Sequence, residues 1–206
     1  MDSARFISFV RENTVFSREV FLIMGYATFF FFLFAFGGYV LSETNPLLVR
    51  DTLDEMSDIV DVLIHMSPLY LALFIFANNS ITALSSSLGG VLFAVLPALT
   101  IAVNGALLGV VFSLTSGSSL FYAGIVPHGV IELPVVLYAT ALGVWLGWGA
   151  VKVVRREEGV VLLKQNIKKV IYTNLCVIFP LLFVAAIIEA YVTPIVLQVF
   201  VGMPIR

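Results

Sequence analysis

The chain contains an uncharged apolar stretch, FLIMGYATFFFFLFAFGGYVL, at residues 21–41. A helix needs about 20 mostly apolar residues to cross a lipid bilayer. The stretch is longer than the ~7–15 apolar residues of a signal peptide, and no small-x-small cleavage site ends it. We therefore expect residues 21–41 to form a membrane-spanning helix that the protein retains.

The overall composition agrees with this expectation and excludes several classes of protein. Of the 206 residues, 60% are hydrophobic and 12% are charged, whereas a soluble domain carries about 25% charged residues. A soluble globular enzyme and a disordered chain are therefore excluded. The net charge of −2 offers no basic surface to nucleic acid. The single cysteine, Cys176, excludes an internal disulfide and a Cys-x-x-Cys metal or redox site.

Four more apolar stretches complete the predicted set of membrane spans. Polar residues from Asn78 onward are expected to end the second span early, and Pro127 and Pro134 to shorten the regular helix of the fourth. The sequence predicts one all-α domain, a polytopic membrane helix bundle with about five transmembrane helices. The spans are expected at about 21–41, 68–81, 88–114, 130–151 and 170–200.

The distribution of basic residues predicts the orientation of the bundle. Nine of the 11 lysines and arginines precede the first span or lie at about 152–169, between the fourth and fifth spans. With five spans these two segments are on the same side, which the positive-inside rule assigns to the cytoplasm. We therefore expect a multi-pass protein of the plasma membrane. Its N-terminus and a basic loop at 152–169 would be cytoplasmic, and its C-terminus external.

The segment between the first and second spans is predicted to form an external amphipathic helix at about 51–66. Its apolar residues recur at helical spacing, and its acidic residues share the opposite face. This acidic face is either a solvated surface near the lipid headgroups or a docking surface for a basic partner. It comprises Asp51, Asp54, Glu55, Asp58 and Asp61.

Two pairs of glycines, each four residues apart, lie within the predicted spans. They are Gly105 with Gly109, and Gly143 with Gly147. Small residues at this spacing let helix backbones approach closely in a membrane. We expect contacts between helices of one chain, with homodimerisation as the alternative.

Several polar residues lie inside the apolar spans, where ionisable groups usually face a partner or a cavity. His128 and Glu132 are four residues apart and therefore share one helical face. Distances along the helices place the two glutamates at similar depth, near the external side. The cluster predicted at this depth is His128, Glu132, Glu189, Thr193 and Asn104, while Asn78 and Asn79 are predicted to lie deeper, toward the cytoplasmic half.

This polar cluster has two interpretations. A histidine and two carboxylates are competent metal ligands, with His128, Glu132 and Glu189 as candidates, and they are equally competent to transfer protons. Alternatively, the cluster is structural, and its hydrogen bonds hold the helices together. We expect no cofactor, apart from a metal ion should the first interpretation hold.

Four motifs, in this order along the chain, resemble those of the stage II sporulation protein M family. They are Asn78-Asn79, Asn104-Gly105 with Gly109, PHGVIELP at 127–134 and AAIIEAYVTP at 185–194. The resemblance implies an integral membrane protein with about five spans. In endospore formers the member that gives the family its name is a membrane anchor for peptidoglycan-degrading enzymes. The family also occurs in prokaryotes that form no spores, so the resemblance does not imply a role in sporulation.

Three functional hypotheses follow from these observations. The first is a non-enzymatic membrane scaffold, whose partners are the lipid bilayer and other membrane or cell-envelope proteins. The second is a transporter or channel-like subunit that uses the buried His-Glu-Glu cluster. The third is an intramembrane metallohydrolase with His128, Glu132 and Glu189 as metal ligands.

Overall fold

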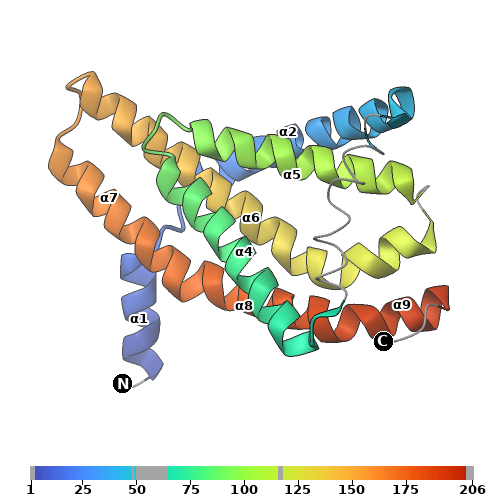
Figure 1. Ribbon diagram of the computed structural model, residues 1–206. Helices are drawn as coiled ribbons and strands as arrows, with labels where there is room; N and C mark the ends of the chain where they lie inside the picture. Colours follow the sequence, from blue (N-terminus) through green and yellow to red (C-terminus); the bar gives the residue numbers. More distant parts are fainter. Residues whose placement is uncertain (1–2, 48, 50–64, 116–117, 203–206) are drawn as a thin grey trace.

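The computed structural model describes residues 3–47, 49, 65–115 and 118–202, and all secondary structure in these ranges is helical (Figure 1). Two of the elements, η1 and η2, are single π-helical turns within a longer helix. In chain order the elements are α1 (Ser3–Asn13), α2 (Arg18–Thr44), α4 (Pro68–Gly89), α5 (Val95–Leu114), α6 (Ser119–Val154), α7 (Val160–Thr173), η1 (Asn174–Ile178), α8 (Phe179–Ile187), η2 (Ile188–Val192) and α9 (Thr193–Val201).

Five helices in the described part of the chain are long and apolar enough to cross a membrane. They are α2, α4, α5, α6 and the continuous helix Val160–Val201, which runs from α7 to α9. The all-α fold with five membrane-spanning helices is therefore confirmed, and the chain is a multi-pass membrane protein. An amphipathic helix was predicted at 51–66. Of this segment the structure describes only residues 65 and 66, so the prediction lies almost entirely outside the described residues.

The second membrane helix is longer than predicted, because α4 continues to Gly89. The third is shorter than predicted, because α5 begins only at Val95. Two serines near the end of α4 fall between the predicted second and third spans, at 68–81 and 88–114, and were therefore not expected inside a membrane helix. Instead, Ser86 and Ser87 are buried. Ser86 Oγ donates to Thr140 Oγ1 at 3.2 Å, and Ser87 Oγ accepts from Asn174 Nδ2 at 2.9 Å. Polar side chains that find partners on neighbouring helices need not interrupt a membrane helix.

The fourth membrane helix also begins earlier than predicted, at Ser119 instead of near residue 130, and it runs through Pro127 and Pro134. A proline inside a helix removes one backbone hydrogen bond and typically bends the helix. Figure 1 shows α6 bent in its N-terminal part, which contains both prolines. Membrane helices tolerate such breaks where neighbouring helices support the freed backbone groups.

The basic segment at 152–169 is mostly helical, which corrects the predicted loop. Only residues 155–159 connect α6 to α7. Leu163 and Ile167 of α7 pack against the buried core of the bundle. This apolar face stabilises the helix, while the lysines occupy its other faces.

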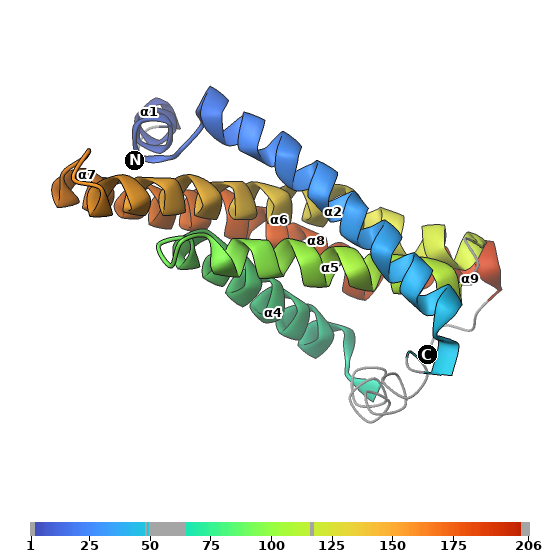
Figure 2. The same cartoon turned by 90° about the horizontal axis from the view of Figure 1, so that it is seen from above.

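Glycines allow the closest helix contacts in the bundle. Figure 2 shows α2 crossing α5 and α6 diagonally. A Cβ atom on Gly109 of α5 would lie 1.8 Å from the Ala35 carbonyl oxygen of α2. A Cβ atom on Gly105 would lie 2.5 Å from the Phe31 carbonyl oxygen. The backbones of α2 and α5 are therefore in direct contact at both glycines.

The second glycine pair makes a similar contact between α6 and the end of α4. A Cβ atom on Gly143 would lie 2.1 Å from the Ser86 carbonyl oxygen, and one on Gly147 would lie 2.6 Å from the Gly90 carbonyl oxygen. Both glycine pairs thus face helices of their own chain.

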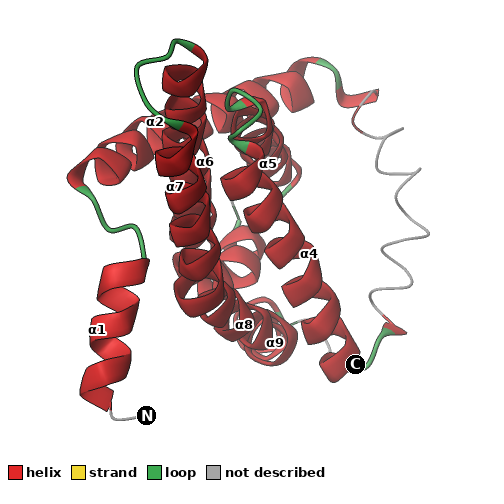
Figure 3. Cartoon of the chain, turned by 90° about the vertical axis from the view of Figure 1, so that its left-hand side faces the viewer, coloured by secondary structure: helices red, strands yellow, loops and turns green. Residues whose placement is uncertain are grey.

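Buried hydrogen bonds attach the N-terminal segment to the bundle. The Val15 amide donates to Thr173 Oγ1 at 3.0 Å, and the Tyr138 hydroxyl donates to the Val15 carbonyl. The rings of Phe9 and Tyr172 meet edge to face with their centroids 5.5 Å apart. Helix α1 itself stands beside the bundle, next to α7 (Figure 3).

Candidate functional site

Two of the candidate side chains come from the bent part of α6. His128 and Glu132 lie one turn apart on the same face, between the two prolines of this helix. Both side chains are half-buried. Because α6 begins at Ser119, both residues lie well inside the helix and not at its start.

Glu189 reaches the same place from the last membrane helix, where it is the second residue of the π-helical turn η2. The Thr193 amide closes this turn by donating to the Ile188 carbonyl, five residues earlier, and Pro194 follows. Proline has no amide hydrogen, so a wider turn here replaces the ordinary helical bond that Pro194 lacks. Single π turns are frequent at functional sites.

The structure brings these three side chains together. His128 Nε2 and Glu189 Oε2 are 4.0 Å apart. One nitrogen of His128 and one carboxylate oxygen each from Glu132 and Glu189 all lie within 4.8 Å of one another. The side chains of His128 and Glu189 are 15% and 32% exposed. We refer to His128, Glu132 and Glu189 as the triad.

The hydrogen bonding of the triad is incomplete. Among the described residues, buried atoms His128 Nδ1 and Glu132 Oε2 have no hydrogen-bond partner. The distance of 4.0 Å between His128 and Glu189 is too long for a hydrogen bond. Buried polar atoms are nearly always paired, so each exception calls for an explanation.

Of the two neighbouring asparagines of α4, one contacts the triad and the other lies at the surface of the bundle. The Asn79 side chain hydrogen-bonds to Glu132. Asn78 is exposed, and its Nδ2 contacts Asn79 Oδ1 at 3.4 Å. Asn79 was predicted to lie deeper in the membrane than Glu132, but the two residues lie side by side. The prediction ended the second span too early and began the fourth span too late.

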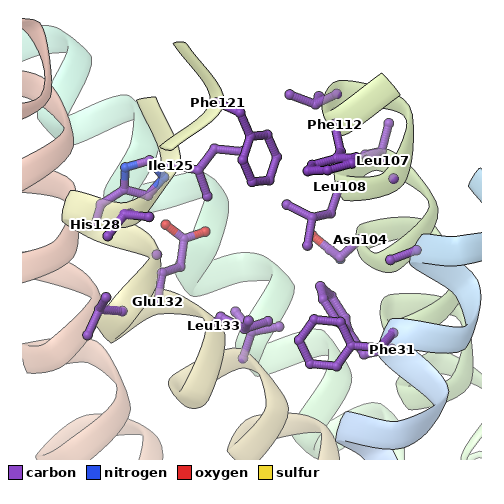
Figure 4. Close-up of a pocket in the computed structure, with 18 of the residues that line it drawn as sticks. Phe31, Asn104, Leu107, Leu108, Phe112, Phe121, Ile125, His128, Glu132 and Leu133 are labelled. Atoms are coloured by element: carbon purple, nitrogen blue, oxygen red, sulfur yellow. The ribbon is translucent and has the colours of Figure 1, made fainter. Parts of the chain in front are cut away.

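The other two candidates of the predicted cluster form hydrogen bonds within their own helices. Thr193 is buried, and its hydroxyl donates to the Ile188 carbonyl at 3.4 Å, within the π turn. Asn104 of α5 donates to the Thr100 carbonyl at 2.8 Å. It lies across a cavity from Glu132 (Figure 4).

This cavity lies between α2, α5 and α6 and has a volume of about 920 Å³. Its wall is mainly aromatic and aliphatic, with polar side chains that include Asn104, His128 and Glu132. Figure 4 shows Phe31, Leu108, Phe112 and Phe121 around it. The volume falls in the range of about 300–1,000 Å³ that is typical of ligand pockets.

The cavity opens on the side of the bundle. Phe36, Leu107 and Val130 line it, yet they are 64%, 52% and 68% exposed. All three belong to helices that can cross a membrane. The opening therefore faces the bilayer.

Sequence reasoning missed a second set of polar residues, at the opposite end of the bundle. Asn174, in η1, is buried and donates to Ser87 Oγ and to the Val170 carbonyl, both at 2.9 Å. An asparagine inside the apolar stretch 170–200 was the signal that could have identified it. The predicted acidic face (Asp51, Asp54, Glu55, Asp58 and Asp61) lies outside the described residues.

The fold and the site together define a class of protein, a multi-pass membrane bundle in which a His-Glu-Glu triad adjoins an apolar cavity. A family model described as Stage II sporulation protein M matches residues 26–194, which include the whole triad. The chain belongs to this family, which confirms the resemblance of its four motifs. No curated protein and no solved structure matches the chain.

Proposed function

We propose that the chain is a non-enzymatic membrane scaffold, and that the cavity between α2, α5 and α6 receives side chains of a partner protein's transmembrane helix that packs over its opening. The observation that carries this proposal is the lateral opening of an apolar cavity of about 920 Å³. Helices associate in membranes through close packing and hydrogen bonds between them. The cavity offers both, because large apolar side chains surround a few polar groups.

The polar groups in the wall supply specificity in this proposal. Asn104 and Glu132 face the cavity from opposite sides (Figure 4). A partner helix with one polar side chain at the matching depth would bond to either residue, while an entirely apolar lipid chain would not. A membrane or cell-envelope protein is therefore favoured over lipid as the occupant.

The proposal includes an orientation. The positive-inside rule places α1 and the connection between α6 and α7 in the cytoplasm, and the C-terminus outside. The proposal also assigns the chain to the plasma membrane. The acidic residues between Asp51 and Asp61 would be external and available to a basic region of the same partner.

Photo-crosslinking in native membranes tests the proposal. A photoreactive phenylalanine analogue is placed at Phe36 or Leu107 in the cavity wall, and at Phe183 or Val199 on exposed faces of α8 and α9 as matched controls. The proposal predicts one discrete adduct with a membrane protein, at the cavity positions only. Val126→Trp, which fills the cavity from α6, should abolish this adduct. Equal adducts at the control positions, or adducts with lipid alone, would refute the proposal.

A transporter or channel-like subunit is the second candidate, and one observation favours it. His128 and Glu132 line the cavity, so a proton or an ion that entered the cavity would meet titratable groups. Proton flux into vesicles that contain the purified chain separates the two candidates. The scaffold predicts that flux equals that of empty vesicles, whereas the transporter predicts flux that Glu132→Gln abolishes.

A further inference from the structure

The chemistry of the triad matches that of a metal site. Imidazole nitrogen and carboxylate oxygen are common zinc ligands, and sets of three protein ligands occur at zinc sites that keep one position open. The triad provides one nitrogen and two oxygens, from two different membrane helices. A site for Mg²⁺ or Ca²⁺ is disfavoured, because those ions prefer oxygen ligands and one of the three triad ligands is an imidazole nitrogen.

The spacing of the triad is close to that of a coordinated ion. Bonds of about 2.0–2.1 Å in a tetrahedron separate the ligand atoms by roughly 3.3 Å. The triad atoms lie within 4.8 Å of one another, and the His128–Glu189 pair is at 4.0 Å. Small side-chain rotations would bring them to coordination distance without moving either helix.

The unpaired atoms distinguish a metal site from a hydrogen-bonded helix contact. In a structural cluster the buried atoms would bond to one another. Instead, His128 Nδ1 and Glu132 Oε2 are left without partners among the described residues. Two carboxylates also lie close together in apolar surroundings, where a divalent cation would balance their charge.

The residues around the triad also favour a metal site. The hydrogen bond from Asn79 orients the Glu132 carboxylate, as partners of metal-ligating groups commonly do. The π turn carries Glu189 toward α6. His128 and Glu132 also line the cavity, so part of the triad borders open space instead of packed side chains.

We propose that His128, Glu132 and Glu189 form a binding site for one divalent transition-metal ion of the Zn²⁺ type. The ion would join α6 to the last membrane helix through η2. This inference does not depend on the scaffold proposal, because it concerns the triad alone and holds whether or not a partner occupies the cavity.

Metal titration of the full chain tests the inference. The protein is purified in mild detergent, stripped with a chelator and titrated with ZnCl₂, and bound metal is counted by elemental analysis. The inference predicts one Zn²⁺ per chain and a higher thermal unfolding temperature than in the stripped protein. MgCl₂ at the same concentration should give neither. A wild-type chain that retains no zinc, or that responds equally to Mg²⁺, would overturn the inference.

Variants locate the ion. His128→Gln, Glu132→Gln and Glu189→Gln nearly keep side-chain size, and each should reduce bound zinc to background and remove the thermal shift. His65→Gln and Glu43→Gln are controls of the same chemistry outside the triad, and Cys176→Ser excludes thiol binding. All three controls should retain one Zn²⁺ per chain.

X-ray absorption of the zinc-loaded wild type gives an independent readout that needs no folded variant. The inference predicts nitrogen and oxygen ligands at about 2.0–2.1 Å and no sulfur. Sulfur coordination, or zinc that persists in all three triad variants, would contradict it.

Discussion

The contact between α2 and α5 leads to a quantitative prediction about Gly109. An added Cβ atom there would lie 1.8 Å from the Ala35 carbonyl oxygen and 2.7 Å from the Tyr39 amide nitrogen. Ordinary contact begins at 3.4 Å, and both neighbouring atoms belong to the backbone. Gly109→Ala therefore forces α2 and α5 apart, because no side chain can rotate to make room.

The expected loss of stability follows from this overlap. Overpacking of a close contact costs about 1–3 kcal/mol, whereas replacing a helical glycine by alanine gains up to about 1 kcal/mol from helix propensity. Gly25→Ala in α2 isolates the propensity term, because no described atom lies within 4 Å of its new Cβ atom. We expect Gly109→Ala to be about 1–3 kcal/mol less stable than Gly25→Ala.

Thermal unfolding of the two variants in detergent measures this difference. For a chain of this size, 1 kcal/mol corresponds to about 2–4 °C in Tm. Gly109→Ala should therefore unfold several degrees below Gly25→Ala. Equal Tm values for the two variants would refute the close approach of α2 and α5.

Three further predictions concern the polar residues and the orientation. Asn174→Leu removes two buried hydrogen bonds and should lower stability by about 1–3 kcal/mol in the same unfolding assay. Glu132→Leu should lower Tm more than Glu132→Gln in metal-free protein, because leucine leaves the Asn79 amide without its acceptor. A cysteine that replaces Asp58 should react with a membrane-impermeant maleimide added to intact cells.

Glu132→Gln is the control for Glu132→Leu, and the other two predictions also have matched controls. Asn78→Leu changes an asparagine that is exposed on a membrane helix, and it should not lower stability. For labelling, the background carries Cys176→Ala, and a cysteine at Glu12 should react only after lysis. Labelling at residue 12 in intact cells would reverse the orientation. Equal losses for the two asparagine variants would show that the bonds of Asn174 contribute nothing.

The sequence was sufficient for the fold class because the signal is length and hydropathy. Residues 21–41 have no charge, and a membrane offers such a segment one stable form, a helix. Helix ends were less predictable, because Ser86 and Ser87 look like a break until their partners are known. Those partners, Thr140 and Asn174, lie 54 and 87 residues away in the chain.

In the candidate site, too, features that depend on spacing within one helix were predictable, and features that depend on packing between helices were not. The spacing of His128 and Glu132 follows from helix geometry, and the depth of Glu189 from its distance along the last span. The π turn that carries Glu189 toward α6 and the contribution of Asn79 depend on how the helices pack. The cavity depends on the bend of α6 and on the contact between α2 and α5, which no local pattern encodes.

Purification of the crosslinked complex into lipid nanodiscs, followed by cryo-electron microscopy, tests the scaffold proposal most directly. The account predicts density for one additional helix over the opening of the cavity, with side chains that reach Asn104 and Glu132. A map in which this cavity holds only lipid, while the partner contacts another face of the bundle, would contradict it.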